Sequence, residues 1–220
     1  SLFCNHKHIP EIEVYILDAG ITEINKSKLR TIAKAYNRII TFIDIDKYLK
    51  WIQKMKLSKY NGSYVIYMKA FLAEFFDVNK NLLYLDCDTV IDGKLDYLWQ
   101  MNMNQKSIAM AIDCMNTKLK TGYGMKKNQL YYNTGVILFN LENWKEHECQ
   151  KKFVDYVRKS KKRYPFADQD LINLCLNDEV YTLPLEFNCI SLYEKYNLKE
   201  IEFIYGLNEE DYYTLSQYEK

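Results

Sequence analysis

The chain has 220 residues, enough for one large α/β domain with a substantial core. Lysine and arginine number 30 against 29 aspartates and glutamates, so the net charge of +1 gives no broad field that attracts nucleic acid or an anionic membrane. No apolar segment approaches the length that spans a bilayer, and the N-terminal residues do not look like a signal peptide. The six scattered cysteines lack a CxxC pair, which fits reduced thiols and argues against zinc. We expect a soluble, cytoplasmic protein that does not bind nucleic acid.

The N-terminal half alternates strand and helix patterns. Residues 12–18 carry apolar side chains on both faces, which predicts a strand covered on two sides, as in a parallel sheet. Apolar positions at helical spacing follow from Asn25, and residues 39–45 predict a second buried strand, which completes a βαβ unit. A serine-capped helix is predicted over residues 63–76 and another strand over 82–86.

The C-terminal half continues the alternation. Residues 107–112 and 136–140 carry strand signals, 142–163 predict one long amphipathic helix, and 168–176 predict a shorter helix that opens on acids. The last residues, 216–220, also follow a helical pattern. We therefore predict a single α/β domain, a Rossmann-like mixed sheet with helices on both faces. In such sheets, ligands bind outside the carboxyl ends of the strands.

Two carboxylates, Asp86 and Asp88, stand where the apolar run 82–85 ends. Alternation along a strand would place both on one side, and leaving both ionised near apolar surroundings is unfavourable without a compensating cation. Oxygen ligands of this kind suit Mg²⁺ or Mn²⁺, which one or two carboxylates commonly hold together with substrate phosphates. The pair therefore indicates a phosphate-bearing substrate.

Three separated segments carry a family resemblance. They are LYLDCDTVIDGKLDYLW (83–99), YYNTGVILFNLENWKE (131–146) and FADQDLINLCLND (166–178). In this order they resemble the retaining glycosyltransferases of family 8, which include bacterial lipopolysaccharide galactosyl- and glucosyltransferases and glycogenin. The resemblance implies a GT-A fold and transfer of a hexose from a UDP-sugar, most often UDP-glucose or UDP-galactose, with retention. It also implies Mn²⁺ or Mg²⁺ and a glycan, lipid-linked or protein acceptor, in the synthesis of lipopolysaccharide or another cell-surface glycan.

The family's DxD motif matches Asp86 and Asp88, of which the second binds the metal and the first also touches the ribose or sugar. Lys69 matches a basic residue at the donor diphosphate and sugar. Asp113, at the end of a predicted strand, is a further donor-binding candidate.

Other matched positions surround the donor sugar. Asn133, Thr134 and Gly135 match a turn beside the sugar, and Asn188 matches an asparagine near the donor. Elsewhere, Asp168 and Gln169 match the DQ pair that meets the sugar hydroxyls and the reacting face, which makes them the catalytic candidates. The resemblance leaves open whether retention proceeds by front-face attack or by double displacement.

The chain departs from the family pattern at both ends. The family normally begins with a strand that contacts the uracil, whereas this chain starts with what resembles the following helix. It normally ends with an HxxGxxKPW segment that supplies a histidine metal ligand and a phosphate-binding lysine, and no such segment is found here. We therefore expect residues 1–220 to form one family 8-like domain that lacks both segments.

Other interpretations stay open at this stage. An isolated DxD is more often a solvated turn, Lys69 could extend along apolar neighbours, 133–135 could be a simple turn, and Asp168 could merely open a helix. A non-catalytic relative that binds a partner is one alternative function. A haloacid-dehalogenase-like phosphohydrolase is another, since residues 86–90 also satisfy that motif. A basic stretch favours a solvated helix face or a peripheral contact with the inner membrane face; it comprises Lys151, Lys152, Lys159, Lys161, Lys162 and Arg163.

Overall fold

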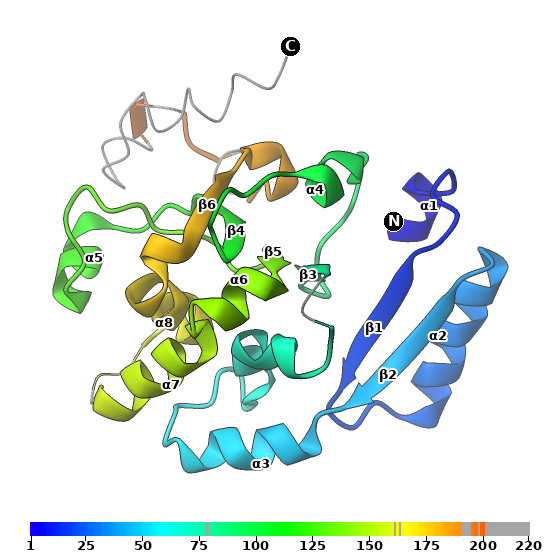
Figure 1. The fold of residues 1–220 in the computed structure, drawn as a ribbon, viewed down its shortest axis with the longest axis horizontal. Coiled ribbons are helices and arrows are strands. Elements are labelled where there is room, and N and C mark those ends of the chain that lie inside the picture. Colours follow the sequence, from blue (N-terminus) through cyan, green and yellow to red (C-terminus); the bar gives the residue numbers. More distant parts are fainter. Residues whose placement is uncertain (78–79, 161, 163, 191–194, 198, 201–220) are drawn as a thin grey trace. The chain divides into compact units, whose positions relative to one another are not determined.

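The computed structural model describes residues 1–77, 80–160, 162, 164–190, 195–197 and 199–200 (Figure 1). The chain forms two compact units. The first, here the N-terminal unit, comprises Ser1–Met68 and Asp88–Met101, and the second, here the sheet unit, comprises Lys69–Cys87 and Asn102–Lys220. The expectation of a single domain stays a prediction, and the expected helix at 216–220 lies outside the described residues.

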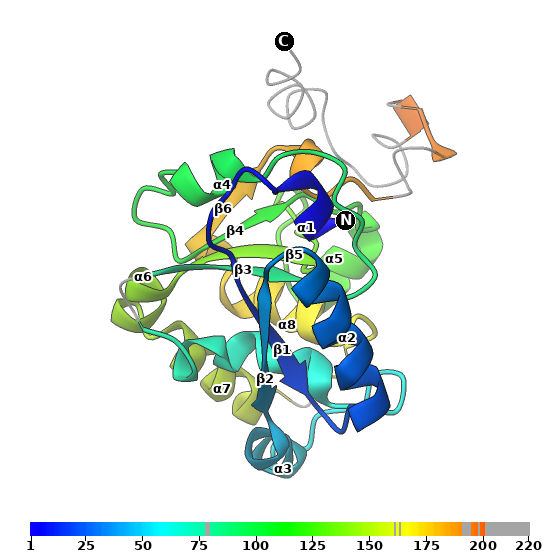
Figure 2. The same cartoon turned by 90° about the vertical axis from the view of Figure 1, so that its right-hand side faces the viewer.

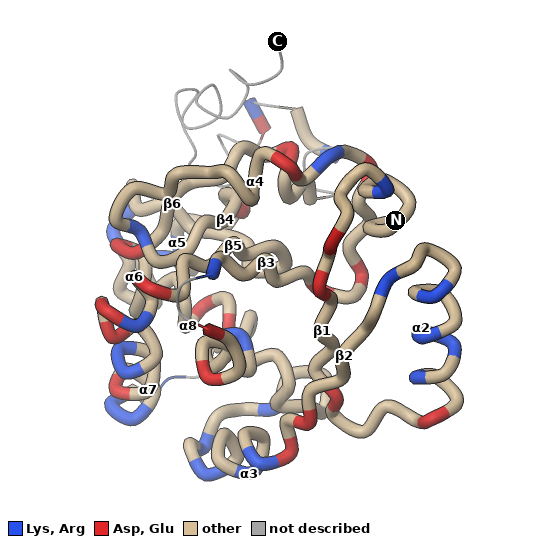
Figure 3. The backbone as a smooth tube through the Cα atoms, turned by 45° about the vertical axis from the view of Figure 1, so that its right-hand side comes forward, with Lys and Arg blue, Asp and Glu red and all other residues tan. Residues whose placement is uncertain are grey.

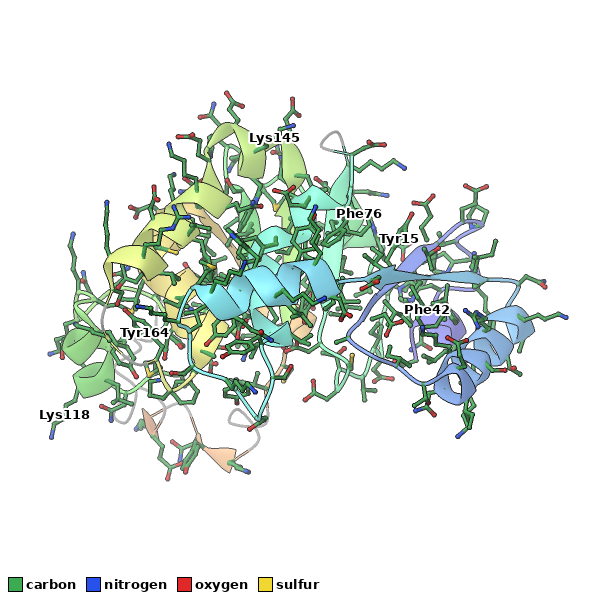
Figure 4. The ribbon with its side chains drawn as sticks, turned by 90° about the horizontal axis from the view of Figure 1, so that it is seen from below. Tyr15, Phe42, Phe76, Lys118, Lys145 and Tyr164 are labelled. Carbon is green, nitrogen blue, oxygen red and sulfur yellow. The ribbon has the colours of Figure 1, made fainter. Side chains whose placement is uncertain are left out.

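The N-terminal unit contains the predicted βαβ unit. Strands β1 (Glu13–Asp18) and β2 (Ile39–Asp44) pair in parallel, and α2 (Glu23–Ala35) connects them. Its other helices are α1 (Leu2–Asn5), α3 (Asp46–Lys54) and α4 (Asp96–Gln100). The side chain of Thr22 accepts a hydrogen bond from the Asn25 amide and so begins α2 with a polar cap. The side chain of Phe42, a residue of β2, points toward α2 (Figure 4), and the Arg30 guanidinium of α2 lies 5.1 Å from its ring centroid.

The prediction that both of these strands are covered on two sides is wrong. Ile39 is 80% exposed and Tyr15 is 39% exposed. Within the described residues this sheet has two strands, so each of them is an edge strand. The apolar run in the sequence therefore indicated a strand correctly but not its burial.

The sheet unit contains a four-stranded mixed sheet in the order β3-β5-β4-β6 (Figures 1 and 2). Its strands are β3 (Asn81–Leu85), β4 (Ile108–Ala111), β5 (Val136–Asn140) and β6 (Val180–Leu183). β5 runs antiparallel to β3 and β4, and β4 runs parallel to β6. The C-terminal ends of β3, β4 and β6 therefore meet the N-terminal end of β5 at one edge, here called the carboxyl edge.

Helices and 3₁₀ segments complete the sheet unit. They are α5 (Thr117–Tyr123), α6 (Leu141–Glu146), α7 (Cys149–Lys159), α8 (Ala167–Cys175), η2 (Asn177–Glu179) and η3 (Leu185–Phe187). α7 packs against α8, and both lie on the same side of the sheet (Figure 2). All four residues of β4 are buried, so the centre of this sheet is covered on both faces. The α/β fold class with a mixed sheet is confirmed.

The predicted helix at 63–76 is a 3₁₀ segment, η1 (Val65–Glu74). The serine cap is confirmed, because Ser63 Oγ accepts a hydrogen bond from the Val65 amide at 3.1 Å. The central residues 67–72 are all buried. Because residues 67–72 have no exposed face, their sequence lacks the alternation of apolar and polar residues that marks an amphipathic α-helix.

The predicted long helix at 142–163 is wrong, because Glu148 adopts a left-handed conformation (φ 52°) that separates α6 from α7. Hydrogen bonds of His147, the residue before Glu148, explain why the helix breaks here. His147 Nδ1 lies 2.8 Å from Glu179 Oε2 and 3.2 Å from Ser107 Oγ. Ser107 precedes β4 and Glu179 precedes β6, so these bonds tie the end of α6 to the sheet and the chain must turn before α7 begins.

We expect Glu179 to make stability sensitive to acid. Burial raises the pKa of its carboxyl, but hydrogen bonds from Lys152, His147 and Ser107 outweigh burial and lower the pKa from 4.5 to about 2. A carboxyl with a lowered pKa stabilises the fold fully above about pH 4.5, and this contribution is lost as pH falls toward 2. The advantage of wild type over Glu179→Gln in urea unfolding should therefore shrink across this interval. In contrast, Glu148→Gln, at an exposed pair with Lys151, should show no such trend.

No helix in the described ranges combines the length and apolar character needed to cross a membrane. None of the six cysteines, all of which lie in the described part of the chain, forms a disulfide. The charged residues of α7 (Figure 3) are mostly basic, with Asp155 as the one acid of the helix. Lys151 pairs with Glu148 at 3.0 Å and Lys152 with Glu179 at 2.6 Å, so the basic face is partly neutralised. Lys161 and Arg163 lie outside the described residues.

Candidate functional site

Most of the predicted site residues lie at the carboxyl edge, because each follows or precedes a strand there. Asp86 follows β3, Asp113 follows β4, Asn188 follows β6 through η3, and 133–135 precede β5. The Asp86 amide donates to the Gly135 carbonyl at 2.8 Å, which extends the β3–β5 ladder by one bond. The antiparallel direction of β5 is what brings its leading turn to the carboxyl ends of the other strands.

A buried cation stands at the centre of this edge. Lys69 Nζ lies 3.0 Å from Asp168 Oδ2 and 3.2 Å from Asp86 Oδ1, and donates to Thr134 Oγ1 at 3.4 Å. The side chains of Lys69 and Asp168 are each only 2% exposed, whereas that of Asp86 is 36% exposed. The interpretation of Lys69 as a solvated lysine that extends along apolar neighbours is therefore wrong.

Asp168 has one satisfied and one unsatisfied oxygen. Oδ2 accepts from Thr134 Oγ1 at 3.1 Å and pairs with Lys69, whereas Oδ1 is buried and has no hydrogen-bond partner in the structure. Burial raises the pKa of this carboxyl to about 6, against the lowering effect of the Lys69 ammonium. A buried acceptor without a partner is unfavourable, and such groups concentrate at ligand and catalytic sites.

A second set of hydrogen bonds joins the amide side chains. Asp113 Oδ2 accepts from Asn133 Nδ2 at 3.0 Å and from Gln169 Nε2 at 2.9 Å. Gln169 Oε1 accepts from the Thr134 amide at 3.2 Å, and Asn188 Nδ2 donates to Asn133 Oδ1 at 2.8 Å. Burial raises the pKa of Asp113, an effect that the bonds from Asn133 and Gln169 oppose. These bonds hold the turn before β5 against the start of α8.

Gly135 lets polar side chains approach the backbone closely. A Cβ on this residue would lie 3.0 Å from Asn133 Oδ1, 3.4 Å from Asp86 Oδ2 and 3.9 Å from Asn188 Nδ2. A side chain here would press against the two oxygens. Glycine at this position therefore allows Asn133 and Asp86 to lie against the turn before β5.

The strand that leads into the DxD motif ends before both acids. β3 ends at Leu85, and Cys87 and Asp88 lie in a turn, so the strand alternation from which we placed Asp86 and Asp88 on one side does not extend to Asp88. Asp88 is exposed and belongs to the N-terminal unit. Among the described residues, no group of three or more His, Cys, Asp or Glu side chains is arranged to hold a metal. The carboxylates of Asp86 and Asp88 are both accessible in part and are the kind of oxygen ligand that suits a divalent ion with further ligands from substrate phosphates.

Sequence reasoning missed Tyr84. Its hydroxyl donates to Asp86 Oδ1 at 2.7 Å, and Lys69 Nζ lies 5.0 Å from the centroid of its ring. The sequence did contain a signal for Tyr84. Alternate residues of a strand point to the same face, so positions 84 and 86 share a face, although we used this rule only for positions 86 and 88.

It also missed two residues that shape the start of α8. Asn173 is fully buried, and its side chain accepts from the Tyr132 amide at 2.7 Å and donates to the Tyr132 carbonyl at 2.8 Å, which fixes the chain before Asn133. Ala167 is buried in a left-handed conformation (φ 48°) immediately before Asp168. Asn173 lies one helical turn after Gln169 and could have been read from that spacing, whereas nothing in the sequence indicated the backbone of Ala167.

Several of the relatives found by sequence comparison are named as glycosyltransferases. The chain is 27% identical over 198 residues to a putative glycosyltransferase of Haemophilus influenzae, covering 86% of this chain and 58% of that protein. It is 30% identical over 131 residues to a lipopolysaccharide 1,2-glucosyltransferase of Escherichia coli, covering 57% of this chain and 39% of that protein. The chain thus spans a little over half of the length of the first of these relatives.

Solved structures give the same result. The crystal structure of the galactosyltransferase LgtC with donor and acceptor sugar analogs superposes with a TM-score of 0.71 at 26% identity, covering 81% of this chain and 64% of that one. Its α/β architecture is the GT-A fold that the sequence resemblance implied. The model of the family named "Glycosyl transferase family 8" matches residues 1–205. The chain therefore belongs to glycosyltransferase family 8.

Proposed function

We propose that the protein is a retaining hexosyltransferase that takes a hexose from a UDP-sugar, UDP-glucose or UDP-galactose, and transfers it to a glycan or glycoconjugate acceptor. The observation that carries the proposal is the buried Lys69 between Asp86 and Asp168 at the carboxyl edge. The names of the relatives support it, since one is a lipopolysaccharide glucosyltransferase and another a galactosyltransferase solved with sugar analogs.

The first chemical requirement of the transfer is to stabilise the departing diphosphate. Breaking the bond between the anomeric carbon and the phosphate oxygen leaves negative charge on UDP, and a fixed cation in a dry site stabilises such charge strongly. Lys69 is held ready for this role by two carboxylates. Asp86 and Asp88 would hold Mn²⁺ or Mg²⁺, which when bound supplies Lewis-acid stabilisation of the same leaving group.

The second chemical requirement is to stabilise the anomeric carbon. It gains positive charge as the diphosphate leaves, and the new bond forms between it and an acceptor oxygen on the same face. Asp168 and Gln169 carry the roles at this carbon. The Asp168 carboxylate acts either as an electrostatic stabiliser or as a nucleophile, and its unpartnered Oδ1 is the atom that fits the role.

Recognition of the sugar falls to the neighbouring polar groups. Asn133 and Asn188 present amide groups close to Gly135, Thr134 places its hydroxyl between Lys69 and Asp168, and Asp113 orients Asn133 and Gln169. Such groups match sugar hydroxyls, which both donate and accept hydrogen bonds.

The acceptor and the location belong to the proposal as well. A glycan, a lipid-linked acceptor or a protein would fit a family 8 enzyme, in a cytoplasmic setting with the chain at most peripheral to the inner membrane face. Because Lys151 and Lys152 are already paired with acids, the basic face of α7 gives only weak support to membrane contact.

A donor screen on the full-length protein with Mn²⁺ tests the proposal, with UDP-glucose, UDP-galactose and related sugars compared by release of UDP. We expect turnover with one of them and loss of donor binding in Asp88→Asn. Asp92→Asn changes an exposed acid in the same segment and should bind the donor as wild type does.

Other outcomes would contradict the proposal. Donor binding without turnover in the presence of acceptors would favour a non-catalytic relative. Release of phosphate from a simple aryl phosphate, without hydrolysis of UDP-sugar, would favour the phosphohydrolase. Equal donor affinity in Asp88→Asn and wild type would remove Asp88 from the site.

A further inference from the structure

Tyr84 is the residue on β3 whose side chain touches two charged groups of the site. It pairs with Ile137 across the β3–β5 ladder, and the Asp86 amide continues that ladder to Gly135. Because the extended backbone persists through Asp86, the side chains at 84 and 86 point to the same face. The tyrosine hydroxyl can therefore reach the carboxylate two residues later.

The hydroxyl and the ring of Tyr84 make different contacts. The hydroxyl donates to Asp86 Oδ1 at 2.7 Å, and this is the same oxygen that lies 3.2 Å from Lys69 Nζ. Meanwhile, Lys69 Nζ lies 5.0 Å from the ring centroid, within the range of a cation–π interaction. One side chain thus contacts both members of an ion pair.

These contacts constrain the carboxylate more than Lys69 does alone. A carboxylate that accepts one hydrogen bond from a lysine can rotate about that bond, because the ammonium is a point charge with no preferred plane. A second donor on the same oxygen from a rigid aromatic side chain fixes the direction of the Cγ–Oδ1 bond. It therefore also fixes the direction of Oδ2, which lies 3.4 Å from the position that a Cβ on Gly135 would take.

We propose that Tyr84 is a positioning residue of the donor site, and that its hydroxyl and ring together hold Asp86 and Lys69 in the arrangement that binds the diphosphate of the donor. The proposal rests on the proposed function, since it concerns how the same site binds UDP. Tyr84 does not itself react or touch the anomeric carbon. Its effect reaches the donor through the orientation of Asp86.

Tyr84→Phe is the decisive variant, because it removes the hydroxyl and keeps the ring over which Lys69 lies. We expect the Kd for UDP with Mn²⁺, measured by calorimetry, to rise about tenfold, the usual effect of losing a hydrogen bond to a charged group. In steady-state assays the KM for the donor should rise by a similar factor while kcat changes little, since the lost contact serves ground state and transition state alike.

A matched control distinguishes the effect of the Tyr84 hydroxyl on UDP binding from the general effect of losing a half-buried hydroxyl. Tyr132 forms an isolated bridge with Ile112 next to the same sheet, and its hydroxyl lies 3.0 Å from Thr182 Oγ1. Tyr132→Phe should lower the melting temperature to a similar extent as Tyr84→Phe and should leave the Kd for UDP as in wild type. If the two variants change the Kd equally, Tyr84 has a structural role only and the proposal is wrong.

A double-mutant cycle tests whether Tyr84 acts through Asp86. Adding Tyr84→Phe to Asp86→Asn should change the Kd for UDP by less than threefold, because the carboxylate that the hydroxyl orients is gone. A full tenfold effect in the Asp86→Asn background would overturn the proposal. If wild type binds UDP and Tyr84→Phe binds it equally well, this inference fails alone. A wild type that binds no UDP at all would instead overturn the proposed donor and this inference with it.

Discussion

Replacing Lys69 with methionine is expected to destabilise the protein by about 3–5 kcal/mol, the usual effect of removing one partner from a buried ion pair. The variant leaves Asp168, with a side chain that is 2% exposed, without its cation, and it removes one of the contacts of Asp86. Methionine matches the length of the lysine stem, so the change tests charge rather than volume. Urea unfolding at neutral pH measures the effect.

A second variant separates the charge from the packing. Asp168→Asn combined with Lys69→Met removes both charges and should recover much of the lost stability, although it should remain inactive. Lys152→Met is the exposed counterpart, since Lys152 is 45% exposed in its pair with Glu179, and it should cost about 1 kcal/mol or less. A Lys69→Met protein as stable as the Lys152→Met protein would show that the buried pair contributes nothing.

Asp168→Asn alone is expected to lower kcat by about a hundred- to a thousandfold, the range found when one preorganised group that stabilises developing charge is removed. Asparagine keeps the shape and the contact with Thr134 Oγ1 but removes the negative charge to which the proposed function assigns a role at the anomeric carbon. Single-turnover measurements with saturating donor isolate the chemical step. A kcat within threefold of wild type would remove Asp168 from the catalytic groups.

The pH dependence of the same reaction gives an independent readout. Burial raises the pKa of Asp168 to about 6, with Lys69 opposing, so the carboxylate ionises as pH rises through about 6. Activity that needs the anion should therefore rise across this range in wild type and show no such rise in Asp168→Asn. Asp170→Asn is the control on the same helix, because Asp170 binds Tyr131 and the Phe166 amide and its loss should leave the rise in place.

The strands that the sequence predicted are those with strong local patterns. β3 and β5 were identified because continuous apolar runs end at polar turn residues, and α2 because its apolar spacing is regular. β6 was missed, as its four residues follow the short segment η2 and give little pattern to read. The break at Glu148 was missed because it depends on His147 reaching residues far away in the chain, which no local pattern encodes.

For the candidate site, motifs carried more information than periodicity. The structure joins Lys69, Asp86, Asp168 and the turn before β5 by direct contacts, although these residues come from distant parts of the chain. Their roles toward donor and metal stay predictions. What no motif revealed is how the groups are supported, by Tyr84 beneath the ion pair and by Asn173 at the backbone of Tyr132. Supporting contacts depend on tertiary packing, so they become visible only once the strands are assembled.

The excursion between β4 and β5 has a use in protein engineering. Residues 112–132, which include α5, leave the sheet at the carboxyl edge and return to it there. The bridge between Ile112 and Tyr132 and the bond from the Asp113 amide to the Tyr131 carbonyl close the base of this loop. Within the loop, Lys120 is buried and Met125 packs with Met115 and Tyr131 in a core cluster, so these side chains cannot be exchanged freely. Libraries that vary only the exposed positions of 117–128, and leave the base and these buried residues intact, should therefore change this surface without displacing the turn before β5.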